Sequence, residues 1–221
     1  GIQTAALAFG GYTAPPVPVG NQTVTEEYDG STWTNNPTGL NTARRSPGGA
    51  GTQTAALAFG GAAVSLVAAT EEYDGSTWTS NPTGLNTARR DPIGLGTQTA
   101  ALAAGGESPG GITGVTEEYN GSTWTSNPTG LNTARTGGGG AGIQTAALAF
   151  GGNLPPVTGA TEEYDGSTWT SNPTGLNTAR NSLAGAGTQT AALGFGGSDP
   201  TGATEEWTGA GAAVTKTITV S

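Results

Sequence analysis

Three observations in the sequence predict an all-β fold, a single five-bladed β-propeller of four-stranded antiparallel blades in which a terminal blade can be incomplete. A motif recurs five times at nearly constant spacing, each repeat alternates as strands do, and a tight-turn dipeptide follows the same strand in four repeats. The 221 residues then form one domain, with repeats at approximately residues 1–44, 45–89, 90–135, 136–180 and 181–221.

The repeat is defined by two anchors. The first is Gln-Thr-Ala-Ala-Leu, whose glutamine recurs at spacings of 50, 45, 46 and 45 residues, as Gln3, Gln53, Gln98, Gln144 and Gln189. The second is Thr-Glu-Glu, whose first glutamate falls at Glu26, Glu71, Glu117, Glu162 and Glu205. Units of about 45 residues with four short strands are typical of propeller blades, which close radially in rings of about four to eight. A β-solenoid stays open as an alternative, although its coils are usually shorter, and the absence of helical periodicity excludes helical solenoids.

The strands follow in order within each repeat. In residues 4–9, Leu7 and Phe9 share one face and the other face carries threonine and alanine, which is the period of a strand with two buried faces. Gly10-Gly11 ends this strand, and residues 24–28 form the next. Asp29-Gly30 then reverses the chain toward Trp33, because both residues tolerate the positive φ of a tight hairpin.

The glycine-rich segment 45–51 precedes the next Gln-Thr-Ala-Ala-Leu. Equivalent segments of the same length end at Gly51, Gly96, Gly142 and Gly187. We interpret the segment as the innermost strand, where neighbouring blades crowd and only small residues fit.

Composition excludes several kinds of chemistry. The chain has no Cys, His or Met, so disulfides, thiolate or imidazole metal sites and Cys or His catalysis are excluded, and we expect no cofactor and no metal. The net charge of −9 and the single lysine, Lys216, argue against nucleic acid as a partner. No apolar run approaches the length of about 18 residues that a membrane-spanning helix needs, so we expect a soluble chain without membrane insertion. A start at Gly1 without any methionine indicates either processing or a piece of a larger protein.

The repeat also resembles a known family. An apolar strand running into a double glycine (Ala8-Phe9-Gly10-Gly11), then Tyr28 and Trp33 five positions later, looks like the kelch motif, and the resemblance covers the whole chain. It is also similar to kelch-type repeat proteins encoded by bacteriophages, where such segments are associated with virion appendages. The resemblance implies the fold strongly and a function hardly at all.

The loop between the double glycine and Thr-Glu-Glu is where the repeats disagree. It has 13 residues in the first repeat (12–24), then 8, 9, 8 and 6 in the others. All five loops leave equivalent strands and emerge on one face, which we predict to be the binding surface. The candidate ligand-binding residues on it are Tyr12, Asn21, Glu107, Asn153 and Asp199. Neutral drift in exposed connections is the competing interpretation.

The Glu-Glu pairs invite a catalytic interpretation, because paired carboxylates hydrolyse glycosides. Adjacent strand residues point to opposite faces, however, so Glu26 and Glu27 do not converge on one substrate. We predict instead that one glutamate of each pair meets an arginine of the Thr-Ala-Arg loops, namely Arg44, Arg89, Arg135 or Arg180, and that the surplus glutamates are solvated or bind a cation. Asp29-Gly30-Ser31-Thr32-Trp33 is close to the structural Asp-box of sialidases, without their arginine cluster, and kelch-type copper oxidases need Cys and His. We therefore expect that the chain is not an enzyme.

Three further expectations concern the core and the ends of the chain. The tryptophans Trp33, Trp78, Trp124 and Trp169 should be buried within or between blades. Ala104 replaces the Phe of the other repeats, so blade three should be the softest unless neighbours fill the gap. Residues 214–220 alternate as a strand, which we place as the outer strand of blade five rather than as a clasp in blade one. Blade one then lacks an inner strand unless residues preceding Gly1 supply it.

The leading functional hypothesis is a non-catalytic interaction module on a virion or cell surface, outside the cell. Its loop face would contact a surface receptor, a glycan or other subunits of an assembly. A purely structural cap or spacer, and a lectin with a weak sugar site between each pair of blades, remain as alternatives.

Overall fold

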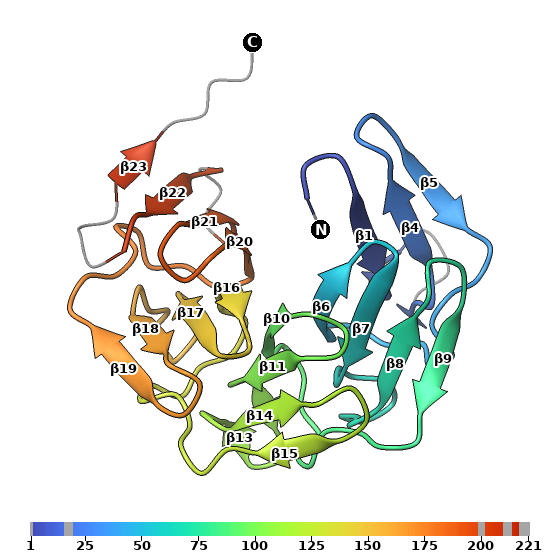
Figure 1. Cartoon of the computed structure of the whole chain (residues 1–221), viewed down its shortest axis with the longest axis horizontal. Coiled ribbons are helices and arrows are strands. Elements are labelled where there is room, and N and C mark those ends of the chain that lie inside the picture. Colours follow the sequence, from blue (N-terminus) through green and yellow to red (C-terminus); the bar gives the residue numbers. More distant parts are fainter. Residues whose placement is uncertain (1, 16–19, 199–201, 210–213, 217–221) are drawn as a thin grey trace.

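The structure is a computed structural model that describes residues 2–15, 20–198, 202–209 and 214–216. Residues 214–216 are described by their backbone only. The described residues contain strands and turns and no helix. Five antiparallel sheets are arranged as blades around a common centre (Figure 1). The predicted five-bladed β-propeller is therefore confirmed.

The blades run from an inner to an outer strand in chain order. Blade one has β1 (Ala6–Phe9), β4 (Thr25–Tyr28) and β5 (Trp33–Asn36). Blade two has β6 (Gly48–Thr52), β7 (Ala55–Phe59), β8 (Thr70–Tyr73) and β9 (Trp78–Asn81). Blade three has β10 (Ile93–Gly96), β11 (Ala101–Ala104), β14 (Thr116–Tyr119) and β15 (Trp124–Ser126). Blade four has β16 (Gly139–Ile143), β17 (Ala146–Phe150), β18 (Thr161–Tyr164) and β19 (Trp169–Asn172). Blade five has β20 (Leu183–Gly187), β21 (Ala192–Gly196), β22 (Thr204–Trp207) and β23 (Val214–Lys216). Two short hairpins, β2 (Tyr12–Thr13) with β3 (Gly20–Asn21) and β12 (Glu107–Ser108) with β13 (Gly111–Ile112), stand in the variable loops.

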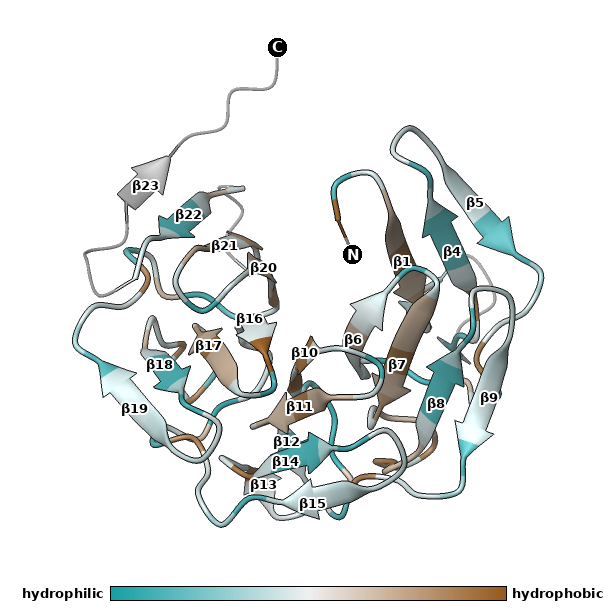
Figure 2. Cartoon of the chain, in the orientation of Figure 1, coloured by the Kyte–Doolittle hydropathy of each residue, from teal (hydrophilic) through white to brown (hydrophobic). Residues whose placement is uncertain are grey.

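The hydrophobic core lies between blades. Leu7 and Phe9 of blade one pack against Ala56, Ala58 and Trp78 of blade two. Because β1 and its equivalents carry large residues on one face and alanines on the other, each large face meets a small face and the blades nest closely. The second strands are accordingly hydrophobic, and the third strands, which carry the Glu-Glu pairs, are the most hydrophilic (Figure 2).

Three of the four predicted core tryptophans are buried, and one is not. Trp78, Trp124 and Trp169 are each 5% exposed, and each indole N–H donates to a threonine hydroxyl of the preceding blade at 2.9 Å. Trp33 is 51% exposed, so its predicted burial is wrong. The reason is tertiary, because in the other blades the preceding blade covers this position, whereas Figure 1 shows no described strand of blade five against blade one.

The gap expected at Ala104 is filled. Ile93 pairs with Ala104 across β10 and β11, where blade two has Gly48 opposite Phe59. Ile93 is 1% exposed and Ala104 is fully buried. The physical reason for a soft blade three is therefore removed.

The ends of the chain follow the predicted arrangement as far as they are described. β23 pairs with β22, which makes it the outer strand of blade five, so the clasp in blade one is wrong for residues 214–216. Residues 217–220 lie outside the described part. Among the described residues, blade one has three strands.

Candidate functional site

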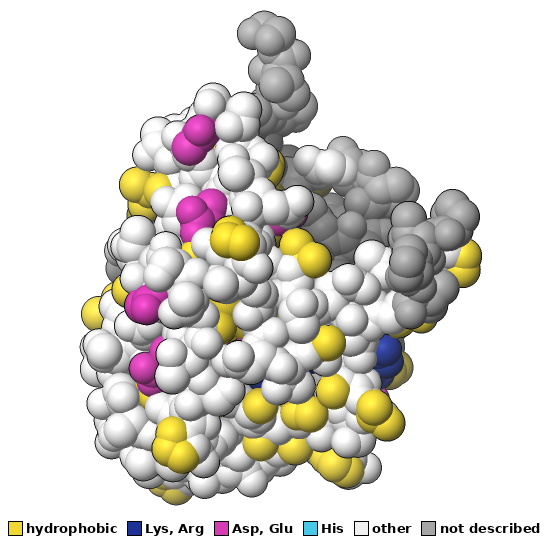
Figure 3. Space-filling view, turned by 90° about the vertical axis from the view of Figure 1, so that its right-hand side faces the viewer, with side chains coloured by type: hydrophobic (Ala, Val, Ile, Leu, Met, Phe, Trp, Pro, Cys, Tyr) yellow, Lys and Arg dark blue, Asp and Glu magenta, His cyan; other side chains and the backbone are white. Residues whose placement is uncertain are grey.

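The variable loops and the segments after Thr-Ala-Arg share one face of the disk, which we call the loop face. Successive turns of an antiparallel sheet alternate between its two ends, so the Asp-Gly turns lie on the opposite face. Seen from the side of blades one and two, the acidic side chains follow one rim, and most of the hydrophobic side chains and a basic one lie toward the other (Figure 3). The two faces therefore differ in chemistry.

The structure brings Tyr12 and Asn21 together with an arginine that sequence reasoning missed. Tyr12 and Asn21 are directly paired across β2 and β3. The guanidinium of Arg45 lies 5.4 Å from the centroid of the Tyr12 ring and donates to the Asn21 amide oxygen at 3.4 Å. Asn21 also donates to the Ala63 carbonyl of blade two at 2.9 Å. This cluster spans two blades and keeps Tyr12 52% exposed.

Glu107 is joined to Arg90. Arg90 donates to one Glu107 carboxylate oxygen from Nε at 3.1 Å and from a terminal nitrogen at 2.6 Å, while the two backbones also pair. Both side chains are about one-third exposed, at 34% and 36%. The hydrogen bond to Glu107 holds the pKa of Arg90 above its ordinary value. This pair is fixed in geometry yet accessible to a partner.

The remaining candidates lie apart. Asn153 pairs with Thr136 through backbone hydrogen bonds of 2.8 and 3.1 Å, and Asp199 lies outside the described residues. Among the described residues no contact joins Tyr12, Glu107 and Asn153 to one another. The candidate residues of different blades therefore lie on separate loops of the loop face.

The loop face also carries exposed hydrophobic side chains that sequence reasoning did not select. They are Val24, Val64, Leu154 and Val157, in addition to Tyr12. The signal that could have found Arg45 and Arg90 was the residue after Thr-Ala-Arg, which is not constant among the linking repeats: it is Arg45, Arg90, Thr136 and Asn181.

The Glu-Glu pairs are part of the scaffold. Each loop arginine forms a buried ion pair with the first glutamate of the next blade, as Arg44–Glu71 (3.1 Å), Arg89–Glu117, Arg135–Glu162 (2.7 Å) and Arg180–Glu205 (3.2 Å). The same carboxylates accept backbone N–H groups, for example that of Asn41 on Glu71 at 2.6 Å. Burial lowers the pKa of Arg44, although the charge of Glu71 opposes this. The predicted clamp is confirmed, and it joins neighbouring blades.

The expectation that the surplus glutamates are solvated or bind a cation is wrong for Glu27, Glu72, Glu118 and Glu163, which accept hydrogen bonds from other side chains. Glu27 accepts hydrogen bonds from Asn36 of its own blade at 2.8 Å and from the Tyr73 hydroxyl of the next blade. Glu72 with Tyr119 and Glu118 with Tyr164 repeat this contact. Burial, and then the hydrogen bond to Glu27, raise the pKa of Tyr73 well above its ordinary range. Blade five has Trp207 at this position, so Glu163 has no tyrosine to meet and accepts from Asn172 at 2.8 Å.

The Asp-Gly turns are also structural. The Asp29 carboxylate accepts the backbone N–H groups of Ser31 and Thr32, both at 2.8 Å. These bonds lower the pKa of Asp29 to about 2, and the same holds for Asp74 and Asp165.

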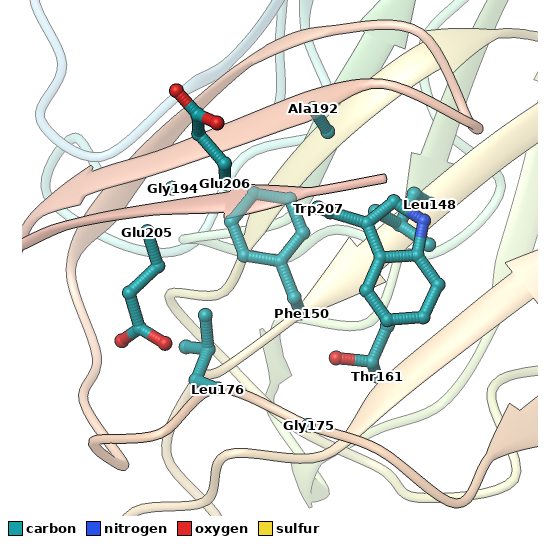
Figure 4. Close-up of a pocket in the computed structure, with 10 residues that line it drawn as sticks. All are labelled: Leu148, Phe150, Thr161, Gly175, Leu176, Ala192, Gly194, Glu205, Glu206 and Trp207. Atoms are coloured by element: carbon teal, nitrogen blue, oxygen red, sulfur yellow. The ribbon is translucent and has the colours of Figure 1, made fainter. Parts of the chain in front are cut away.

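The interface between blades four and five contains a small cavity of about 20 Å³, lined by Phe150, Leu176 and Trp207 among others. The carboxylates of Glu205 and Glu206 point to opposite sides of β22 (Figure 4), which separates them as the strand period predicts. The volume is about that of one water molecule and far below that of a sugar.

Among the described residues no group of three or more acidic, His or Cys side chains could hold a metal ion. No helix long and apolar enough to cross a membrane occurs there either. No protein-family model matches the chain, and no curated protein matches it significantly. The fold and the local geometry therefore carry the functional argument.

Proposed function

We propose that this chain is a non-catalytic binding module whose loop face contacts a partner protein. The observation that carries the proposal is the contrast between the faces. The Asp-Gly turns and the inter-blade ion pairs repeat almost unchanged, whereas the variable loops range from 6 to 13 residues in length and differ in their side chains. A rigid scaffold with variable loops is a common arrangement of binding proteins.

The chemistry of the loop face favours a protein partner. Aromatic residues and arginine are enriched at protein interfaces, and Tyr12 against Arg45 presents both. Val64, Leu154 and Val157 add exposed hydrophobic area on the loops of blades two and four. We place the module outside the cell or on a virion, a proposal that rests on the kelch-like resemblance and on the Thr-rich composition with one lysine.

A lectin with one sugar site between each pair of blades has less support. Its aromatic platforms would have to be the repeated tryptophans, yet Trp78, Trp124 and Trp169 are buried and hydrogen-bonded to threonine. The repeated carboxylates, which a hydrolase would need, are held in ion pairs and tyrosine contacts.

The experiment exchanges the longest loop. Residues 12–24 are replaced by residues 62–69, the shorter loop of blade two, because surface loop length changes closure entropy only weakly. Binding of the parent and the variant is measured on a library of displayed protein fragments and on a glycan array. A parent that binds protein fragments through its loop face should lose that binding in the variant.

The control is Asp29→Asn on the opposite face, which should leave binding unchanged. Equal binding by the loop variant and the parent would refute the loop face as the site. Five equivalent weak glycan sites would favour the lectin, and no binding at all would favour a structural part.

A further inference from the structure

Two junctions between blades on the loop face have the same backbone and different side chains. Arg45, which follows Thr-Ala-Arg, exchanges backbone hydrogen bonds of 3.0 and 2.9 Å with Ala62, which follows the double glycine of blade two. Arg90 and Glu107 occupy the equivalent positions at the junction of blades two and three and exchange bonds of the same lengths. The side chains of the two junctions can therefore be compared directly.

The junction of blades two and three shows what an arginine at this position binds. The backbone bridge brings the Glu107 carboxylate to Arg90, which donates to it from Nε at 3.1 Å and from a terminal nitrogen at 2.6 Å. An arginine in this place thus meets a carboxylate that comes from the side of the next blade.

Arg45 has no such carboxylate, because alanine stands at position 62. Every other arginine of the chain forms an ion pair with a glutamate, and among the described residues none pairs with Arg45. Residues 16–19, which complete the neighbouring loop and lie outside the described part, contain no acidic residue either. The positive charge of Arg45 is therefore not balanced by its own loop or junction.

The neighbours of Arg45 orient its side chain without neutralising it. The guanidinium lies 5.4 Å from the centroid of the Tyr12 ring and donates to the Asn21 amide oxygen at 3.4 Å. Asn21 is fixed in turn by its bond to the Ala63 carbonyl at 2.9 Å. A guanidinium carries more N–H donors than this one contact uses, so donors of Arg45 remain for a partner in a preorganised position.

The surroundings of Arg45 are uncharged and partly apolar. Tyr12 is exposed, and Val64, two residues after Ala62, is fully exposed. A partner that covers this surface takes Arg45 out of water, which is costly unless the partner brings an opposite charge. The net charge of −9 repels a strongly acidic partner, so the chemistry fits a segment with one carboxylate among uncharged residues.

We propose, building on the proposed function, that Arg45 binds the carboxylate of an Asp or Glu side chain in an otherwise apolar segment of the partner protein. The carboxylate meets Arg45 from the side of Ala62, as Glu107 meets Arg90. Tyr12 packs on the apolar residues beside it. The planar guanidinium supplies selectivity, because its donors match the two oxygens of a carboxylate.

The experiment uses fragments that the parent chain selects from the displayed protein-fragment library. Fragments that fail to bind the chain with the exchanged 12–24 loop are kept, because they depend on the loop face. Their Asp and Glu residues are then changed one at a time to Asn and Gln. One such change should weaken binding to the parent about tenfold or more, and binding to the Arg45→Gln chain about twofold or less, because that chain has already lost the contact.

Three further variants separate charge from size and shape. Ala62→Glu supplies the carboxylate within the chain, as Glu107 does for Arg90, and should lower the affinity for these fragments about tenfold or more. Ala62→Gln has the same size without the charge and should lower the affinity much less. Arg45→Lys should retain only part of the parent affinity, because an ammonium lacks the planar fork. A Tm within about 2 °C of the parent shows that a variant is folded, and the Arg45→Gln comparison decides alone if Ala62→Glu is not.

The outcomes distinguish this site from the loop face as a whole. Fragments that depend on the 12–24 loop but bind Arg45→Gln as well as the parent would overturn the carboxylate site and leave the proposed function standing. Equal losses in Ala62→Glu and Ala62→Gln, or no acidic residue coupled to Arg45, would contradict the site in the same way. A library without any loop-dependent fragment would refute the proposed function and the carboxylate site together.

Discussion

Ile93 of β10 lies directly opposite Ala104 of β11, where blades two and four place glycine opposite phenylalanine. The isoleucine also reaches the next blade, because a Cβ on Gly140 would come within 2.6 Å of its Cγ2. Phe59 contacts the next blade in the same way, because a Cβ on Gly94 would come within 2.9 Å of its ring. The pair of isoleucine with alanine and the pair of glycine with phenylalanine thus fill equivalent spaces between the inner strands of neighbouring blades.

This exchange predicts strong coupling between positions 93 and 104. Ala104→Phe alone should destabilise the chain by about 1–3 kcal/mol through overpacking. Ile93→Gly alone should cost about 2–5 kcal/mol through the cavity that it leaves. The double variant restores the pair of blades two and four, so its loss should fall short of the sum by roughly 1–3 kcal/mol in urea unfolding. Simple additivity would mean that the two side chains do not share this space.

The buried ion pair between Arg89 and Glu117 should be far more costly to break than an accessible pair. Glu117→Gln leaves the Arg89 charge uncompensated in the interior and should lower the free energy of unfolding by about 3–5 kcal/mol. Glu107→Gln removes a partly exposed pair with Arg90 and should cost about 0–1 kcal/mol. Similar losses in chemical denaturation would show that burial is not the deciding factor.

Trp33 should dominate the quenchable fluorescence. It is 51% exposed, whereas Trp78, Trp124, Trp169 and Trp207 are between 5% and 7% exposed. Trp33→Phe should remove most of the acrylamide-accessible emission, and Trp124→Phe, the matched control, should leave that part of the emission in place. Weak quenching of the parent chain would mean that another surface covers Trp33 in solution.

The Asp-Gly turns predict a loss of stability in acid. The folded pKa of Asp29, Asp74 and Asp165 is about 2, below the ordinary value of 3.8, so these groups stabilise the fold above about pH 4. That stabilisation is lost as the pH falls from about 4 to 2. The triple Asp→Asn variant should lose less Tm over this interval than the parent, measured by thermal scans at several pH values.

Asparagine is a suitable replacement at these turns. The Asn120 side chain accepts the N–H groups of Ser122 at 3.0 Å and Thr123 at 2.9 Å, so the same turn forms without a titratable group. Equal acid sensitivity in the parent and the triple variant would show that the Asp-Gly turns do not cause the loss.

The repeat made most of the fold predictable. Five copies of one motif, with Leu7 and Phe9 on one strand face and a hairpin dipeptide after Tyr28, define the strands and their order, because strand period and turn chemistry are local properties. The pairing of an arginine with one glutamate of each pair was also predictable, since a buried charge needs an opposite one, and the structure shows that it is the first glutamate. Even the outer position of Val214–Lys216 followed from the length of the tail.

The tertiary structure decided which neighbour each side chain meets. Four of the repeated tryptophans have nearly the same local sequence, yet Trp33 is exposed and Trp78 is buried, because only Trp78 has a preceding blade packed on it. The second glutamates bind tyrosines about 46 residues farther along the chain, as Glu27 does with Tyr73, and Arg45 contacts Tyr12 across two blades. Sequence determined the blade, because its information is local and repeated, whereas the contacts between blades depend on register and on which faces find a partner.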